Sequence, residues 1–249
     1  MIYVTLAAYN EEKNIGALID AVAAMSAKSG VKSAIVVVND GSKDKTRDVI
    51  ESRRGKIRIE LIDQPNAGFL KALTRALQKT AEIANEEDVC VTMDADNTHS
   101  PELIPQLLVK IGAGADVVIA SRFERGGKMI GVPFHRVVLS EGAKLVMSLL
   151  VPVKNVRDYS TAYRAYRVKL LREAFHAYPD NLLEGKGFSG MAGFLIRLSK
   201  LTPRIAEVPF VLRYDLKEGA SSMNIGKTFE GYLALIAGYW TGKYNPRGR

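Results

Sequence analysis

The 249-residue sequence has few of the residues from which disulfide frameworks and zinc sites are built. It contains one cysteine, Cys90, inside a short apolar run, and three histidines that lack metal-ligand spacing. A single cysteine cannot form a disulfide within the chain, so a secreted disulfide-rich scaffold is excluded and a reducing compartment is expected. We expect Cys90 to fill the core rather than act as a nucleophile, and we expect no zinc site.

The sequence also lacks long apolar runs. No stretch approaches the ~20 residues that a membrane-spanning helix needs, and the N-terminus leads into a predicted strand without signal-peptide features. We therefore expect a cytoplasmic protein, free or peripheral to the cytoplasmic face of a membrane. Lysine and arginine outnumber aspartate and glutamate by 35 to 27, for a formal net charge of +8. These basic residues are scattered, without a basic arm or an RNA signature, which favours phosphorylated substrates or anionic lipid over nucleic acid.

Two common nucleotide-binding signatures are absent as well. No G-x-G-x-x-G opens a helix after the first predicted strand, and no G-x-x-x-x-G-K-[ST] occurs anywhere. Polar and acidic side chains follow the predicted strands instead. Such side chains can accept hydrogen bonds from a base and a ribose, while a metal ion binds the phosphates.

The first half of the sequence alternates regularly between apolar strands and amphipathic helices. Strands are predicted at 3–7, 34–38, 57–62, 89–93 and 117–120, and helices over 15–25, 42–53, 70–84 and 103–111. Ser42 is expected to cap the second helix, and Ser100 with Pro101 to begin the fourth. This alternation predicts an α/β fold with a mainly parallel, doubly wound sheet flanked by helices.

The pattern changes after Ser121. Residues 122–133 are rich in glycine and basic residues, which predicts a mobile loop. An apolar helix is predicted from Phe134 to Leu150, a strand at 205–211, and a second apolar helix over 229–240. Each helix either packs on the sheet or lies at a membrane surface, which the aromatic side chains Tyr232, Tyr239 and Trp240 would favour.

Two carboxylates, Asp94 and Asp96, follow the predicted strand at 89–93. Side chains two residues apart on an extended chain leave the same face, so both can point at one site beyond the strand end, where open α/β sheets bind ligands. Hard oxygen ligands suit Mg2+ or Mn2+, which take one or two carboxylates and complete their coordination with phosphate oxygens and water. The alternative is that both residues cap the next helix, although Ser100 and Pro101 already supply a cap there.

The polar motifs that follow the strands resemble, in type and order, those of family 2 glycosyltransferases with the GT-A fold. They are Tyr9-Asn10-Glu11-Glu12, Asn39-Asp40-Gly41-Ser42, Asn66-Ala67-Gly68 and Asp94-Ala95-Asp96. Later motifs resemble the dolichyl-phosphate mannose synthase group of that family: Ser121-Arg122-Phe123, Arg136 with Ser140, the segment from Asp158 to Arg164, and Glu207-Val208-Pro209. The resemblance covers nearly the whole chain.

The resemblance implies a role for each motif. Tyr9, Asn10, Glu11, Asp40 and Gly68 would bind the nucleotide, and Asp94 and Asp96 would bind Mg2+ or Mn2+ and, through it, the diphosphate. Arg122, Arg136 and Ser140 would contact an acceptor phosphate, and Arg213 with Lys217 would close a loop over the diphosphate. Residues 1–121 would form the nucleotide-sugar half of a single domain, and residues 122–249 its acceptor half.

The activity implied is inverting, metal-dependent transfer of a hexose, with mannose favoured over glucose, from GDP-mannose or UDP-glucose to polyprenyl or dolichyl phosphate. A phosphate nucleophile is already ionised near pH 7 and needs cationic positioning rather than a base. Two alternatives stay open. The same fold with a soluble hydroxyl acceptor would need a general base, for which Asp158 is the candidate. A non-catalytic nucleotide-binding module at a membrane is disfavoured because both Asp94 and Asp96 are retained.

Overall fold

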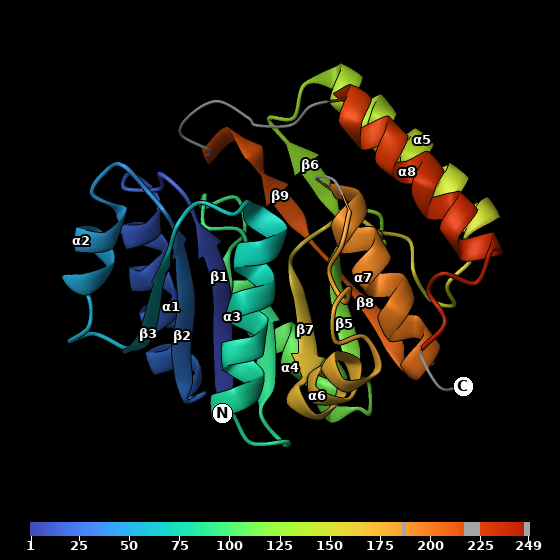
Figure 1. Cartoon of the computed structure of the whole chain (residues 1–249). Helices are drawn as coiled ribbons and strands as arrows, with labels where there is room; N and C mark the ends of the chain where they lie inside the picture. Colours follow the sequence, from blue (N-terminus) through green and yellow to red (C-terminus); the bar gives the residue numbers. More distant parts are fainter. Residues whose placement is uncertain (186–187, 217–224, 247–249) are drawn as a thin grey trace.

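The computed structural model describes residues 1–185, 188–216 and 225–246 (Figure 1). The strands of its main sheet are β1 (Ile2–Ala8), β2 (Ser33–Asp40), β3 (Arg58–Gln64), β4 (Val89–Thr92), β5 (Val117–Ser121), β7 (Arg164–Arg167) and β8 (Ile205–Pro209). They form one seven-stranded sheet in the order β3-β2-β1-β4-β7-β5-β8. Every pairing in it is parallel except the two made by β7, which runs antiparallel to β4 and β5.

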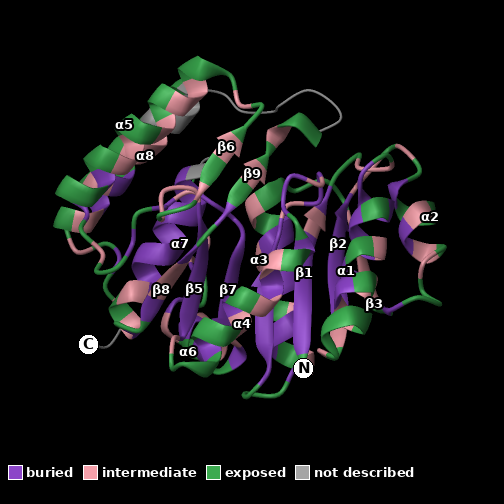
Figure 2. Ribbon diagram, turned by 180° about the vertical axis from the view of Figure 1, so that it is seen from behind, coloured by how far each residue is buried: buried purple, intermediate pink, exposed green. Residues whose placement is uncertain are grey.

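Helices cover both faces of this sheet. They are α1 (Ile15–Ser29), α2 (Thr46–Glu51), α3 (Phe69–Ile83), α4 (Ile104–Gly112), α6 (Val168–Ala177) and α7 (Phe188–Leu201), with a 3-10 turn at Pro101–Leu103 before α4. Alternate residues of a strand point to opposite faces. In β2, Val36 and Val38 pack with residues of α3, α6 and α7, whereas Ile35 and Val37 pack with residues of α1 and α4. The two views agree, with α3 and α7 in front in Figure 1 and α1 and α4 in front in Figure 2.

The predicted doubly wound sheet is confirmed, with five strands and four helices of the first half in their predicted order. Cys90 is fully buried in this sheet, and burial raises the pKa of its thiol to about 12, as expected for a core residue. Ser100 accepts a hydrogen bond from the Glu102 N–H and is followed by Pro101, so the predicted cap is confirmed.

The capping role predicted for Ser42 is wrong. The helix begins at Thr46, and the Ser42 hydroxyl instead accepts a hydrogen bond from the Asn10 N–H at 3.0 Å. Asp44 accepts from the Thr46 N–H at 3.0 Å. The reason is that residues 42–45 close against the segment after β1 before the chain turns into α2.

The second half departs further from the prediction. Residues 128–130, predicted as part of a mobile loop, form strand β6 (Lys128–Ile130), which pairs in parallel with β9 (Val211–Arg213). The predicted strand at 205–211 is divided at Phe210 between β8 and β9, so that it joins both sheets. The pairing partner of residues 128–130 is more than 80 residues away, which local sequence patterns do not reveal.

Two long helices lie outside the main layers. Figure 1 shows α5 (Phe134–Leu150) and α8 (Ile225–Trp240), together with β6 and β9, beyond the carboxyl ends of the parallel strands. A 3-10 turn at Tyr214–Leu216 follows β9. In the described part of the chain, no helix has the length and hydropathy to cross a bilayer.

Candidate functional site

The segment after β4 forms a tight turn at the carboxyl edge of the sheet. Its Asp96 carboxylate, with the residue 9% exposed, accepts hydrogen bonds from the Thr98 N–H at 3.2 Å and the Thr98 hydroxyl at 2.7 Å. Asn97 has a φ of +63°, a left-handed conformation that asparagine adopts more readily than most residues. The turn therefore holds Asp96 in a defined place, while the Asp94 side chain is 34% exposed.

The segments after β1 and β2 are bound to each other. The Asn10 side-chain oxygen accepts from the Lys43 N–H at 2.8 Å, and the Glu11 N–H donates to the Thr46 hydroxyl at 2.8 Å. The Glu11 carboxylate accepts from the Asn14 side chain at 2.8 Å. Tyr9 remains 44% exposed beside them. Tyr9, Asn10 and Glu11 thus share one edge of the sheet with Asp40, as the order of the motifs implied.

Asp40 and Gly68 meet directly. The Asp40 carboxylate, at the end of β2, accepts from the Gly68 N–H at 2.9 Å, the Ala67 N–H at 2.8 Å and the Gln64 amide at 2.6 Å. The residue is 3% exposed. Gly68 has a φ of +90°, in the region that favours glycine, and α3 begins at the next residue. In this structure Asp40 therefore shapes the loop that leads into α3.

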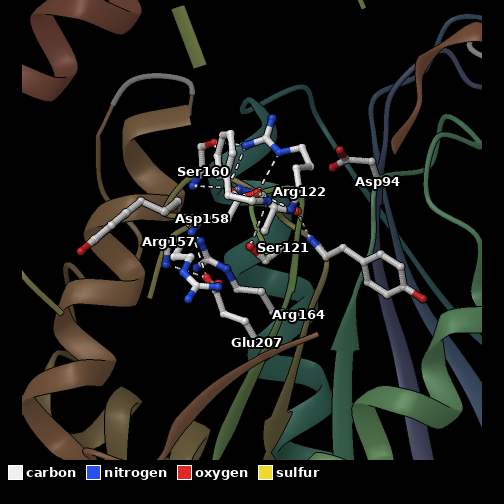
Figure 3. A network of polar contacts seen from close by, with 12 residues as sticks. Asp94, Ser121, Arg122, Arg157, Asp158, Ser160, Arg164 and Glu207 are labelled. Carbon is white, nitrogen blue, oxygen red and sulfur yellow. Dashed lines mark hydrogen bonds and ion pairs between the residues drawn. The ribbon is translucent and has the colours of Figure 1, made fainter. Parts of the chain in front are cut away.

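Arg122 and Asp158 form a buried ion pair at the end of β5 (Figure 3). The Arg122 guanidinium donates from Nε at 2.8 Å and from Nη2 at 2.7 Å to the two carboxylate oxygens, and Nη2 also donates to the Ser160 hydroxyl at 2.7 Å. Asp158 is 0% exposed. Burial alone would raise the pKa of the Asp158 carboxyl, but the charge and hydrogen bonds of Arg122 more than offset it, and that pKa lies below its ordinary value.

The ion pair lies next to the carboxylate turn. Figure 3 shows the Asp94 carboxylate pointing toward Arg122, and Asp94 is one of the charges that raise the pKa of Arg122. Tyr232 of α8 packs against the core, and Arg122 and Asp158 are among the charges that act on its phenol. Burial raises the pKa of Tyr232. Of the two arrangements left open for this helix, Tyr232 therefore fits packing on the rest of the protein.

Glu207 of β8 is hydrogen-bonded to the backbone of the Asp158 segment. Its Oε1 atom accepts from the Arg157 N–H at 2.7 Å and the Asp158 N–H at 2.9 Å. Burial raises the pKa of this carboxyl. The sequence alone assigns Glu207 no role, because its partners lie about 50 residues away in the chain.

The remaining acceptor-side residues lie around β9 and the first turns of α5. Arg136 donates to the Tyr214 hydroxyl at 2.8 Å, and Ser140 lies one turn further along α5. Arg213 pairs with Asp215 at 2.8 Å and is 44% exposed, so its charge is partly compensated before any ligand binds. Lys217 lies outside the described residues.

The outer surface of α5 is apolar. Seven of its large apolar side chains are exposed, at between 42% and 82%: Phe134, Val138, Leu139, Leu145, Val146, Leu149 and Leu150. In α8, Leu233 and Trp240 are exposed at 54% and 70%, while Tyr239 packs against the core. Of the three aromatic side chains that would favour a membrane surface, Trp240 is thus the exposed one, while Tyr232 and Tyr239 are half-buried.

The residues of the carboxylate turn fit a hard divalent cation. Asp94 and Asp96 supply oxygen ligands only, and Mg2+ or Mn2+ in phosphate-binding sites needs just one or two protein carboxylates. The described residues contain no group of three or more histidine, cysteine or acidic side chains that could hold a metal ion. A cation at this turn would therefore depend on the phosphate oxygens of a bound nucleotide.

Comparison with known proteins places this geometry in a family. Residues 3–175 match the model for glycosyl transferase family 2. The chain is 31% identical over 235 residues to the dolichol-phosphate mannosyltransferase of Pyrococcus furiosus, covering 94% of this chain but only 62% of that relative. It is 32% identical over 222 residues to the undecaprenyl-phosphate mannosyltransferase of Micrococcus luteus, covering 85% of this chain and 86% of that relative.

The fold is also found in solved structures. Glucosyl-3-phosphoglycerate synthase from Mycobacterium tuberculosis, in a crystal with Mn2+, UDP and glucosyl-3-phosphoglycerate, superimposes with a TM-score of 0.65 over 100% of this chain and 81% of that chain. The two sequences are 20% identical. This likeness establishes a shared GT-A architecture with a central, mostly parallel sheet.

Proposed function

The chain belongs to glycosyl transferase family 2, and on that premise we propose that it moves a hexose, mannose in preference to glucose, from a nucleotide sugar to a polyprenyl or dolichyl phosphate. The choice of mannose and of a lipid phosphate is supported by the two relatives described above, both named as mannosyltransferases acting on such acceptors.

The donor would bind along the carboxyl ends of β1, β2 and β4. Tyr9, Asn10 and Glu11 border the position for the nucleoside, with the loop shaped by Asp40 and Gly68 on its other side. Asp94 and Asp96 would hold a Mg2+ or Mn2+ ion against the diphosphate. When bound, such an ion stabilises the negative charge that develops on the leaving nucleotide. Residues 1–121 would thus make up the donor half.

The observation that carries the choice of a phosphate acceptor is the buried pair of Arg122 and Asp158. A hydroxyl acceptor would need a general base, and Asp158 is the candidate for that role. Its carboxylate already accepts from Arg122 through both oxygens and has a lowered pKa, so it would be a weak base. A phosphate acceptor needs no base, because it is ionised near neutral pH.

Arg122 would then position the acceptor. Its hydrogen bonds to Asp158 and Ser160 use Nε and Nη2, and among the described residues Nη1 has no hydrogen-bond acceptor. Arg136 and Ser140 would contact the same phosphate from α5, and Arg213 with Lys217 would lie over the diphosphate. In the reaction, an acceptor phosphate oxygen attacks the anomeric carbon, the bond from that carbon to the nucleotide diphosphate breaks, and the configuration inverts.

The apolar surface of α5 supports an acceptor that remains at a membrane. Moving an isoprenoid tail from lipid into water costs ~0.8 kcal/mol for each CH₂ group. The seven exposed apolar side chains of α5 would lie in the interface of the cytoplasmic leaflet, with the exposed Arg125 and Lys128 attracted to anionic headgroups. The protein would thus be peripheral, and residues 122–249 would make up the acceptor half.

A donor panel tests this function. Purified protein would be incubated with Mg2+ or Mn2+, dolichyl or undecaprenyl phosphate, and either radiolabelled GDP-mannose or UDP-glucose. We expect label in the organic extract, with GDP-mannose the better donor and the signal lost on chelation with EDTA. Label that appears only on an added water-soluble hydroxyl acceptor would favour the hydroxyl alternative and overturn the proposal.

A further inference from the structure

His99 lies at the end of the carboxylate turn and contacts Asp94 with both ring nitrogens. Its Nδ1 atom accepts a hydrogen bond from the Asp94 N–H at 3.0 Å. Its Nε2 atom lies 3.5 Å from the Asp94 carboxylate oxygen Oδ2. Because Nδ1 is an acceptor here, the ring hydrogen of the neutral imidazole lies on Nε2, on the side of the carboxylate.

The ring of His99 is fixed by aromatic neighbours. It is 3% exposed and stacks on Tyr163, with ring centroids 5.1 Å apart and planes inclined by 18°. Phe210 contacts it edge-on at a centroid distance of 5.2 Å. The Tyr163 hydroxyl also donates to the Ser100 carbonyl at 2.8 Å. Rotation of the imidazole would require both neighbouring rings to move.

We propose that His99 is a positioning residue for Asp94, held in place by the rings of Tyr163 and Phe210. This inference rests on the proposed function, in which Asp94 is a metal ligand. The imidazole fixes the backbone of Asp94 through Nδ1 and faces its carboxylate through Nε2. Side chains that hydrogen-bond to ligating carboxylates orient them, and their loss commonly weakens metal binding by about 10- to 100-fold.

The contact between His99 and Phe210 joins the carboxylate turn to the acceptor half. Phe210 lies between β8 and β9, and its N–H donates to the Ser121 carbonyl at 2.9 Å. The Arg213 N–H donates to the Thr98 carbonyl at 3.4 Å. His99 thus packs on Phe210, and Phe210 is hydrogen-bonded to Ser121, the residue before Arg122.

A matched series of variants separates positioning from packing. His99→Phe keeps a ring between Tyr163 and Phe210 but removes both nitrogens. His99→Asn keeps an acceptor near the position of Nδ1 but loses the ring, and His99→Ala loses both. His176→Asn, an exposed histidine on α6, controls for loss of a histidine as such. Binding of Mn2+ in the presence of GDP or UDP would be followed by the electron paramagnetic resonance signal of the free ion, without acceptor or turnover.

We expect Mn2+ binding to weaken by about tenfold or more in His99→Phe, to be stronger in His99→Asn than in His99→Ala, and to be unchanged in His176→Asn. Thermal unfolding would verify that each variant is folded. Wild-type affinity in folded His99→Phe overturns the inference. If that variant does not fold, equal affinities of His99→Asn and His99→Ala overturn it. Loss of binding in Asp96→Asn with retention in His99→Phe would leave the proposed metal site intact and refute the role of His99 alone. A wild type that binds no Mn2+ with either nucleotide refutes both.

Discussion

The halves that we propose for the donor and the acceptor, residues 1–121 and 122–249, present different chemistry at the same edge of the sheet. After β1, β2 and β4, short segments hold polar side chains in place with hydrogen bonds, such as those from Ala67 and Gly68 to the buried Asp40. In the other half, α5 exposes seven large apolar side chains to its surroundings. The difference fits a donor that arrives from water and an acceptor that stays in lipid.

The ion pair of Arg122 and Asp158 lies at the boundary between these halves. Arg122 follows β5, the last strand of the donor half, and Asp158 precedes β7. Removing one member of a buried pair leaves the other charge uncompensated, which commonly costs 3–5 kcal/mol. The two halves therefore depend on each other for stability at this ion pair.

The largest expected effect comes from a substitution at the proposed metal site of the donor half. We expect Asp96→Asn to reduce transfer by about a thousandfold or more, because losing one anionic ligand removes several kcal/mol of stabilisation of the leaving group. Nucleotide binding that depends on Mn2+ should weaken in parallel. Steady-state rates with saturating acceptor would measure this change.

The control for that variant is Glu102→Gln, which neutralises a nearby carboxylate that is 79% exposed. It should transfer the sugar at the wild-type rate. If Asp96→Asn also kept the wild-type rate, the carboxylate turn would be a helix cap and not a metal site.

The donor half was predictable because its signals are local. Each strand is a short β-branched run, each helix has an apolar stripe, and parallel strands bring their carboxyl ends to one edge. That reasoning is sufficient to place Tyr9, Asp40 and Asp94 along the same edge. It does not reveal that the Asp40 carboxylate accepts hydrogen bonds from the loop before α3. These donors come from residues 64–68, and their positions depend on the path of that loop.

The acceptor half was less predictable because its contacts are distant in sequence. Strand β7 is only four residues long and begins with Arg164, which is 0% exposed. A buried arginine hides a strand from hydropathy patterns. Here its Nη1 and Nη2 atoms donate to the carbonyls of Met191 and Tyr159, while its buried Nε atom has no hydrogen-bond partner among the described residues. Histidine spacing likewise gave no hint of His99, since the role proposed for it depends on Asp94, five residues away, and on the rings of Tyr163 and Phe210, which are distant in sequence.

The next largest effect should come from the apolar surface of the acceptor half. We expect the wild type to co-sediment with anionic liposomes, less strongly at high salt, and we expect the double substitution Leu149→Asp and Leu150→Asp to abolish that association. These side chains are 68% and 43% exposed, so charges there should not disturb the core. Nucleotide affinity should stay unchanged.

The matched control is Val109→Asp on α4, a residue of the donor half that is 70% exposed. It adds one negative charge, half of what the double variant adds, at an apolar position as open as Leu149 and away from α5, and it should leave liposome binding intact. A loss half as large as that of the double variant would mean that net charge, rather than the α5 surface, governs the association. A wild type that ignores liposomes containing dolichyl phosphate would favour the soluble-acceptor alternative.

A smaller effect is expected on the KM for the acceptor, without a change in donor affinity. We expect Arg136→Ala to raise the KM for the acceptor by about tenfold while the Kd for the donor nucleotide stays the same, because a charge-assisted hydrogen bond contributes about 1.5–3 kcal/mol. Tyr214→Phe, which removes the hydroxyl that Arg136 contacts, should cause a weaker change of the same kind. An equal loss of donor affinity would place Arg136 on the donor side.

The smallest expected effect is on the pH dependence of stability in the acceptor half. It comes from Glu207, which holds the Asp158 segment through hydrogen bonds. Burial raises the pKa of Glu207 in the folded protein, whereas in the unfolded chain the carboxyl ionises near pH ~4.3. A raised pKa means that the contribution of this group to stability is present below about pH 4.3 and is lost as pH rises through the folded-state pKa.

Glu207→Gln tests this dependence because glutamine keeps an oxygen that can accept from the Arg157 and Asp158 N–H groups but carries no charge. The free energy of unfolding of the variant, relative to wild type, should therefore increase from pH 4 upward and level off above the folded-state pKa. Urea unfolding of both proteins at intervals from pH 4 to pH 8 would measure it, and the titrating groups that do not interact with Glu207 cancel in the difference. Two curves that stay parallel over this range would mean that Glu207 carries no burial penalty. The hydrogen bonds to residues 157 and 158 would then be its whole contribution.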